Sequence, residues 1–197
     1  MRRFLYDQLR PDAIVSGFDV PLEQCPPLRG RVYIFLSAIA MFYAPSDPSG
    51  IGGMYCERIR ATPSWHSGPP RNDCVLVTND LAVEGMQGLN VGRIQFFFSF
   101  THEGERYPCA LIQWFSLVGN VPCEETGMWI VEPDLDHTGR PVQSVIHLET
   151  IVRGVLLVPV YGEEFIPSHI TFSNSLGAFG AYYVNKYADH HANEILF

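Results

Sequence analysis

The chain has 197 residues, of which 47% are hydrophobic and 17% are charged, and this composition excludes an intrinsically disordered protein. Its net charge is −8, with 13 basic residues against 21 acidic ones, which argues against a general binder of duplex nucleic acid. Five cysteines without a C-x-x-C pair predict an intracellular, reducing compartment, and no stretch approaches the ~20 apolar residues of a membrane span. We therefore expect one soluble domain with no membrane partner.

The first 73 residues divide into three predicted segments. Residues 1–30 combine apolar anchors with four prolines, which indicates a segment that wraps around the domain without regular structure. The apolar run from Arg31 to Tyr43 predicts a strand buried on both faces, with a short helix as the alternative. Residues 44–73 are rich in proline and glycine and predict a long loop, a type of segment that is often functional.

A hairpin from Val91 to Phe115 is the predicted centre of the core. In its first arm, alternate residues are apolar and would share one face of the strand: Ile94, Phe96, Phe98 and Phe100. In its second arm the corresponding set is Ala110, Ile112 and Trp114. Residues 101–106 include a glycine and three charges, and they predict the turn.

Short strands are predicted at residues 74–78, 128–131, 142–148 and 155–161, without helical periodicity between them. This spacing predicts a mainly β fold, an antiparallel distorted barrel or sandwich over residues 31–161. Residues 162–197 should pack on the barrel as a helical segment. There Ser173 or Asn174 would cap one C-terminal α-helix that runs through Tyr187.

Two sets of residues are candidates for binding. Aromatic residues at strand ends can form a cage for a methylated ammonium group through cation–π attraction. The candidates for this cage are Tyr107, Trp114, Phe115 and Trp129. We weight a core role for them over a cage by roughly four to one.

The second set is the local positive excess between residues 58 and 71, which would bind DNA phosphates and stack on a base. It consists of Arg58, Arg60, Trp65 and Arg71.

No enzyme motif marks any serine, cysteine or carboxylate pair. Histidine-based metal chemistry is the third hypothesis, with His137, His147, His190 and His191 as its candidate ligands. Adjacent histidines on a helix point about 100° apart and rarely bind one ion, so we favour a structural role. We expect no metal, no cofactor and no catalytic residue.

Several segments resemble the C-terminal region of basidiomycete fungal DNA-transposon proteins, the Plavaka and Kyakuja–Dileera–Zisupton transposase-like groups. They include YAPSDPSGIGGM, ERIRATPSW, VGRIQFFFSF, ETGMWIVEP and YVNKYADHHANEI, and the resemblance extends over nearly the whole chain. In that family the catalytic acidic residues lie in a nuclease domain upstream of this region. The resemblance therefore implies an accessory module and carries over no catalytic residue.

Residues 72–161 are also similar, more weakly, to bromo-adjacent homology domains, through NDCVLV, VGRIQFFFSF, ALIQWF and VIHLETIVRGVLLV. That similarity implies a β-rich module that binds chromatin proteins, some of which read histone tails. We predict a non-catalytic, transposon-derived module that binds a protein or chromatin partner in the nucleus. The negative charge would suit a basic partner such as a histone tail. DNA binding through the arginines is the alternative, and the oligomeric state stays open.

Overall fold

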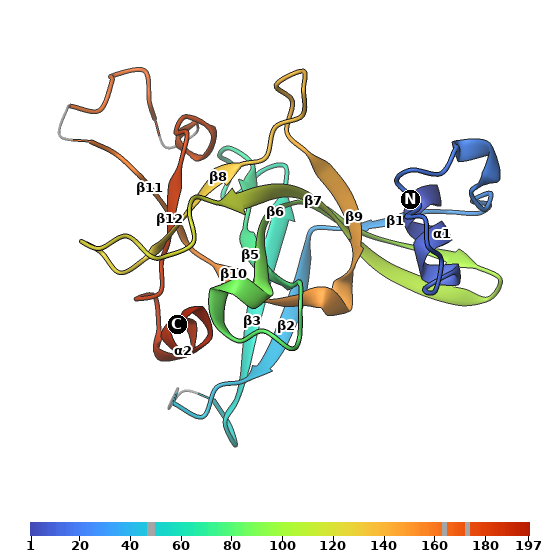
Figure 1. Ribbon diagram of the computed structural model, residues 1–197, viewed down its shortest axis with the longest axis horizontal. Coiled ribbons are helices and arrows are strands. Elements are labelled where there is room, and N and C mark those ends of the chain that lie inside the picture. Colours follow the sequence, from blue (N-terminus) through green and yellow to red (C-terminus); the bar gives the residue numbers. More distant parts are fainter. Residues whose placement is uncertain (47–49, 163–164, 172–173) are drawn as a thin grey trace.

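The computed structural model describes residues 1–46, 50–162, 165–171 and 174–197 (Figure 1). Its longest strands, β6 (Leu89–His102) and β7 (Glu105–Leu117), form the predicted central hairpin. They are joined at Glu103 and Gly104, which both have a positive φ. Such a turn matches the twist of the flanking strands, and its second position suits glycine.

A nine-stranded antiparallel sheet is built around this hairpin, in the order β10-β5-β6-β7-β8-β12-β11. In addition, β1 pairs with β6 and β9 pairs with β7. The two ends of the order, β10 and β11, are separated in sequence only by Leu156, so the sheet curls into a nearly closed barrel. The other strands of this sheet are β1 (Tyr33–Phe35), β5 (Cys74–Thr78), β8 (Trp129–Pro133), β9 (Gln143–His147), β10 (Ile151–Val155), β11 (Leu157–Pro159) and β12 (Tyr182–Val184).

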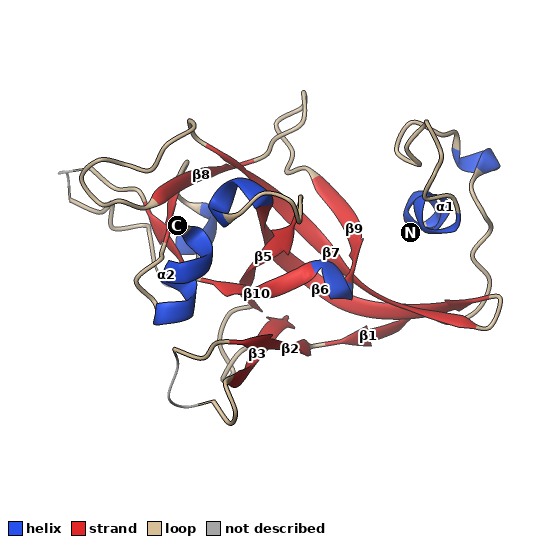
Figure 2. Cartoon of the chain, turned by 60° about the horizontal axis from the view of Figure 1, so that its bottom comes forward, coloured by secondary structure: helices blue, strands red, loops and turns tan. Residues whose placement is uncertain are grey.

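A small three-stranded sheet forms a second layer against the barrel (Figure 2). It consists of β2 (Ser37–Tyr43), β3 (Met54–Thr62) and β4 (Arg71–Asn72). Ile59 and Ala61 of β3 pack against buried residues of the hairpin and β5 to form one core cluster. A second cluster fills the inside of the curled sheet, and it includes Phe115, Trp129 and Tyr182.

Two helices lie at opposite ends of the molecule (Figure 1). Helix α1 (Arg2–Leu9) places Phe4 and Leu5 against Phe100 and Tyr107, near the turn of the central hairpin. Helix α2 (His190–Leu196) packs beside the barrel. No helix among the described residues is long and apolar enough to cross a membrane.

The predicted fold class is confirmed: the protein is mainly β, with an antiparallel barrel-like sheet and a C-terminal helix. The expected loop over residues 44–73 is wrong, because β3 and β4 lie within it. The expected burial of the 31–43 strand on both faces is also wrong. That run is divided into β1 and β2, and its outward side chains, such as Ile34 and Met41, are exposed.

The C-terminal helix lies later in the chain than predicted. Residues 182–184 form β12 and α2 begins only at His190, whereas the expected helix ran from residue 174 to Tyr187. The proposed cap Ser173 lies outside the described residues. At the other end, residues 1–30 do not wrap around the barrel, because α1 packs on the end of the hairpin.

A β-bulge changes the faces of the central strand. Ile94 pairs with Ile112 and Phe96 with Leu111, so Gln95 is the extra residue. The predicted shared face is therefore wrong: Ile94 packs with Phe97 in one cluster, whereas Phe98 and Phe100 pack in another. Phe96 remains 37% exposed. The predicted face of the second arm is confirmed, with Ala110, Ile112 and Trp114 in one cluster.

Candidate functional site: an arginine-lined cleft

A cleft of about 610 Å³ separates the small sheet from the C-terminal part of the barrel. One wall is formed by β3 and β4, and the other by β10, the start of β11 and the start of α2. Four arginines and three carboxylates line it: Arg58, Arg60, Arg71, Arg153, Glu57, Asp73 and Asp189. The cleft therefore brings together three of the four predicted DNA-contacting residues, together with charges contributed by distant parts of the chain.

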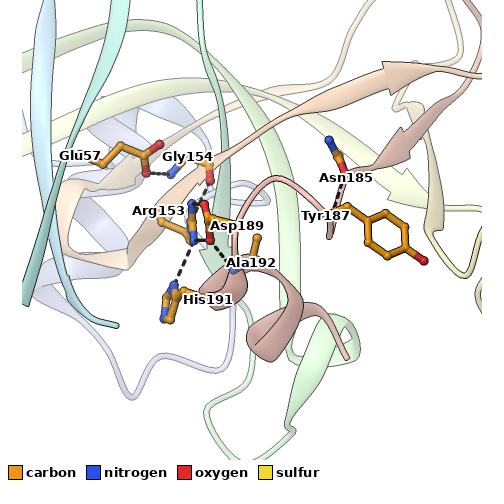
Figure 3. Close-up of polar contacts among 8 residues, drawn as sticks. All are labelled: Glu57, Arg153, Gly154, Asn185, Tyr187, Asp189, His191 and Ala192. Carbon is orange, nitrogen blue, oxygen red and sulfur yellow. Dashed lines mark hydrogen bonds and ion pairs between the residues drawn. The ribbon is translucent and has the colours of Figure 1, made fainter. Parts of the chain in front are cut away.

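The floor of the cleft contains a buried ion pair. Arg153 of β10 is only 4% exposed, and its Nη1 and Nη2 donate to the two carboxylate oxygens of Asp189 at 2.8 and 2.6 Å (Figure 3). Asp189 also caps α2, because its Oδ1 accepts a hydrogen bond from the N–H of Ala192 at 2.7 Å. One carboxylate thus begins the helix and attaches it to the barrel.

Two rings surround this ion pair. Nη1 of Arg153 lies 3.0 Å from Nδ1 of His191, and the His191 ring stacks on Phe42 of β2 with centroids 4.6 Å apart. The Arg153 guanidinium lies 4.9 Å from the centre of the Phe42 ring. Because a guanidinium can only donate, Nδ1 of His191 must accept, which places the proton of the neutral ring on Nε2.

The pKa values of these groups follow from their burial and charges. Burial and the neighbouring Arg153 charge lower the pKa of His191, so the ring stays neutral at pH 7. The hydrogen bond from Arg153 lowers the pKa of Asp189. Burial acts to lower the pKa of Arg153, but the hydrogen bonds and charge of Asp189 outweigh it and raise that pKa overall. The floor is thus a fixed cation–anion pair with a neutral histidine beside it.

A further contact connects the two walls of the cleft. The backbone N–H of Gly154 donates to Oε2 of Glu57 on β3 at 2.9 Å (Figure 3). A Cβ atom at position 154 would lie 2.8 Å from the other oxygen of Glu57, so a larger residue there would displace this carboxylate. This contact holds the small sheet at a defined distance from β10.

Trp65 does not line the cleft itself, but two guanidinium groups from the lining, those of Arg60 and Arg71, lie over its ring. The guanidinium carbon of Arg60 lies 4.7 Å from the ring centroid, and that of Arg71 lies 4.9 Å from it. Trp65 is held in a tight turn between β3 and β4, where its N–H donates to the carbonyl of Pro69 at 3.1 Å. Such stacking orients guanidinium groups that would otherwise be flexible.

The rim arginines differ in their partners. Arg71 forms a salt bridge with Asp73, with Nε 2.7 Å from Oδ1. Arg60 donates to the carbonyl of Arg58, and the exposed Arg58 donates to the hydroxyl of Ser37 at 3.0 Å. Among the described residues, neither Arg58 nor Arg60 forms a salt bridge. Two cationic side chains of the cleft therefore lack an anionic partner there.

The four predicted cage residues do not converge on one pocket. Phe115 and Trp129 are buried inside the barrel, and Tyr107 is buried near α1. Trp114 packs on the opposite face of β7 from Phe115, and its Nε1 donates to the hydroxyl of Ser144 at 2.7 Å. A cavity of about 320 Å³ touches Trp114, Phe115 and Asp134, but adjacent residues of a strand point to opposite faces and cannot form one cage.

The candidate histidines are also separated. His191 belongs to the cleft floor, whereas His147 lies at the end of β9 and His137 in a turn before it. Within the described part of the chain, no three histidine, cysteine or acidic side chains form a group that could hold a metal ion.

The sequence analysis did not predict the residues of the floor. Arg153 is the single charge in the run Ile151–Val160, and a lone arginine in a buried strand indicates a buried ion pair. Asp189 precedes the helical run that begins at His190, which is the position of an N-cap. These two signals were present, but no sequence pattern connects one residue with the other.

We found no significant match to the chain among protein-family models, curated protein sequences or solved structures.

Proposed function

We propose that the protein is a non-catalytic interaction module whose arginine-lined cleft binds an acidic segment of a partner protein. The observation that carries this proposal is the contrast in pairing among the four arginines. Arg71 and Arg153 have carboxylate partners, whereas Arg58 and Arg60 have none among the described residues. A guanidinium forms bidentate hydrogen bonds to a carboxylate, so the two unpaired groups are suited to carboxylates from outside the chain.

The arrangement favours a short acidic segment over duplex DNA. Three carboxylates stand beside the four arginines, so the cleft has only a small positive excess. Duplex DNA carries one negative charge per about 1.7 Å and is bound by extended basic surfaces. The net charge of −8 for the whole chain would also repel it. For a peptide with two or three carboxylates, the positive charges of Arg58 and Arg60 are sufficient for binding.

This proposal differs from the sequence-based expectation in the charge of the partner. The expected histone-tail site depended on an aromatic cage, and the four aromatic residues lie in separate places. A non-catalytic role in binding protein stays our proposal. The transposon origin, the chromatin partner and the nuclear location stay predictions.

The test is a titration with a fluorescent eight-residue peptide of alternating glutamate and valine, followed by fluorescence anisotropy at two salt concentrations. We expect the wild-type protein to bind it, and the double variant Arg58→Ala/Arg60→Ala to bind about 100-fold more weakly. This estimate takes about 1.4 kcal/mol, or tenfold, for each lost charge-assisted hydrogen bond. The control variant Arg140→Ala removes an exposed arginine outside the cleft lining and should bind like the wild type.

Three results would contradict the proposal. One is a failure of the wild-type protein to bind the peptide, and another is equal binding by the double variant. The third is tighter, strongly salt-dependent binding of a labelled DNA oligonucleotide that is lost in the same double variant. That result would replace the acidic peptide with the DNA alternative.

A further inference from the structure

We infer that the acidic segment binds as an extended strand, added antiparallel to the free edge of β3 inside the cleft. This inference rests on the proposed function and specifies the conformation and the sequence pattern of the partner. Strand addition is a common way for a sheet with an open edge to bind a peptide, because the backbone supplies affinity and alternate side chains supply specificity.

The edge of β3 is open because β4 ends early. β2 pairs with β3 along its length, from Ser37 with Arg60 to Tyr43 with Met54. On its other side β3 has only the two residues of β4, which pair with Ala61 and Thr62. The chain then turns into β5, and the rest of β3 faces the cleft without a partner strand among the described residues.

Asp73 already extends the β4 pairing by one step. Its N–H donates to the carbonyl of Arg60 at 2.9 Å, and its Oδ2 accepts from the N–H of Arg60 at 2.9 Å. The carboxylate thus occupies the place that a backbone carbonyl would take in a continued strand. An added peptide would continue the ladder beyond this point, in the direction of β4.

The hydrogen-bonding register shows which backbone groups face the cleft. The N–H of Ala61 donates to Leu36 and the N–H of Ala44 donates to Gly53, so the odd-numbered residues of β3 bond to β2. In an antiparallel ladder the intervening residues point their N–H and C=O groups to the other side. The groups of Cys56 and Arg58 therefore point into the cleft, and the carbonyl of Arg58, which accepts from the side chain of Arg60 at 3.3 Å, has a second lone pair for a peptide N–H. The N–H of Met54 is bonded to the carbonyl of Ile51, so the open edge runs from Tyr55 to Arg58 and spans roughly 13 Å at ~3.3 Å per residue.

The side chains around this edge define a pattern for the added strand. Residues of the peptide that lie opposite Arg58 share its face of the sheet, where Arg60 also lies, and carboxylates there would meet the unpaired guanidinium groups. The intervening residues would point toward the opposite wall of the cleft, where Val155, Leu156 and Leu157 are apolar. The partner segment should therefore alternate acidic and apolar residues.

The experiment compares the alternating glutamate–valine peptide with two N-methylated forms of it. In the expected register the glutamate N–H groups face β3, because these residues pair directly with Arg58 and Cys56. Methylation of the glutamate amides should therefore weaken binding at least tenfold. Methylation of the valine amides, which face away from β3, should change the affinity by no more than about twofold.

A protein variant tests the same hydrogen bonds from the other side. Cys56→Pro removes an N–H that faces the cleft and leaves the bonds to β2 intact, a position at which a strand tolerates proline. We expect it to weaken binding about tenfold, while the control Cys56→Ser binds like the wild type. Circular dichroism shows whether each variant is folded, and the two methylated peptides decide the question if the proline variant is not.

The possible failures are distinguishable. Equal binding of all three peptides, with loss in the arginine double variant, would overturn strand addition and leave the proposed function in place. No binding of the unmodified peptide would overturn both.

Discussion

Arg153 and Arg58 line the same cleft but have opposite surroundings. Arg153 is buried, with two hydrogen bonds to Asp189, one contact to His191 and the ring of Phe42 beside it. Arg58 is exposed, and among the described residues its guanidinium donates to the hydroxyl of Ser37 while its carbonyl accepts from the side chain of Arg60. A buried guanidinium without its carboxylate is costly, whereas an exposed one is solvated by water.

The comparison separates the structural from the binding part of the cleft. Substitutions in the floor should lower the free energy of unfolding, because Arg153 connects β10, α2 and β2. Substitutions of Arg58 and Arg60 should leave that free energy unchanged and affect ligand binding alone. Four sets of variants test this division.

Asp189→Ala should have the largest effect on stability. It leaves Arg153 buried without an anion and removes the N-cap of α2. Breaking a buried ion pair costs about 3–5 kcal/mol, and since Asp189 is 36% exposed at its side chain we expect about 2–3 kcal/mol. Urea unfolding followed by circular dichroism measures the change. Asp189→Asn retains a cap, so it should lower the free energy of unfolding by less. If Asp189→Ala lowered that free energy by less than about 1 kcal/mol, the floor would not be the main stabilising part of the cleft.

Phe42→Ala should have the second largest effect. The ring contacts both the Arg153 guanidinium and His191, and we expect a loss of about 1–2 kcal/mol from these contacts. The matched control is Tyr43→Ala, the next residue of β2, whose side chain points outward and is largely exposed. Equal destabilisation of the two variants in urea would show that the contact with the ion pair contributes little.

The stability should fall as the pH is lowered below the ordinary histidine pKa of 6.5. The pKa of His191 is lowered in the folded protein, so the unfolded chain binds the proton more readily in that window. The stability that depends on neutral His191 is therefore complete above 6.5 and is lost as the pH falls through the folded value. His191→Gln keeps an acceptor for Arg153 but does not titrate, so its urea midpoint should vary less between pH 7 and pH 5. An unchanged slope would contradict the assigned role.

Arg58→Ala and Arg60→Ala should have the smallest effect on stability. Within the described part of the chain both side chains lack a carboxylate partner, and surface substitutions of this kind change the free energy of unfolding by no more than about 0.5 kcal/mol. Thermal unfolding of the two single variants and of the double variant checks this. A loss above about 1 kcal/mol would place the rim among the structural elements and weaken its assignment as a binding surface.

The sequence predicted those parts of the fold in which local pattern and tertiary packing agree. The central hairpin shows this agreement, with alternating aromatic residues in its strands and a glycine at Gly104 in its turn. The bulge at Gln95 was not predictable, because an extra residue leaves no mark in a run of three phenylalanines. Strand β3 was hidden by the prolines and glycines on both sides of it, although Tyr55, Ile59 and Ala61 alternate as a strand requires.

The candidate site was predicted in part. The positive excess identified Arg58, Arg60 and Arg71 with Trp65, and the structure brings the three arginines to one cleft, with Trp65 stacked on two of them. Their placement on β3 and β4 was not predicted. This placement puts the free edge of β3 beside them. The floor required Arg153 and Asp189 to meet across 36 positions of the sequence, and only the curled, nearly closed sheet brings them together.

The order of the large sheet has a consequence for folding during protein synthesis. β12 lies between β8 and β11, so β11 is joined to the sheet only through a strand that is made after it. When residues 1–160 have emerged from the ribosome, strands β1 to β11 have been made, yet the sheet cannot curl into its barrel-like form until residues 182–184 follow. Contacts of such long sequence separation slow folding, so the cleft should become competent to bind only after residues 182–189 have been synthesised.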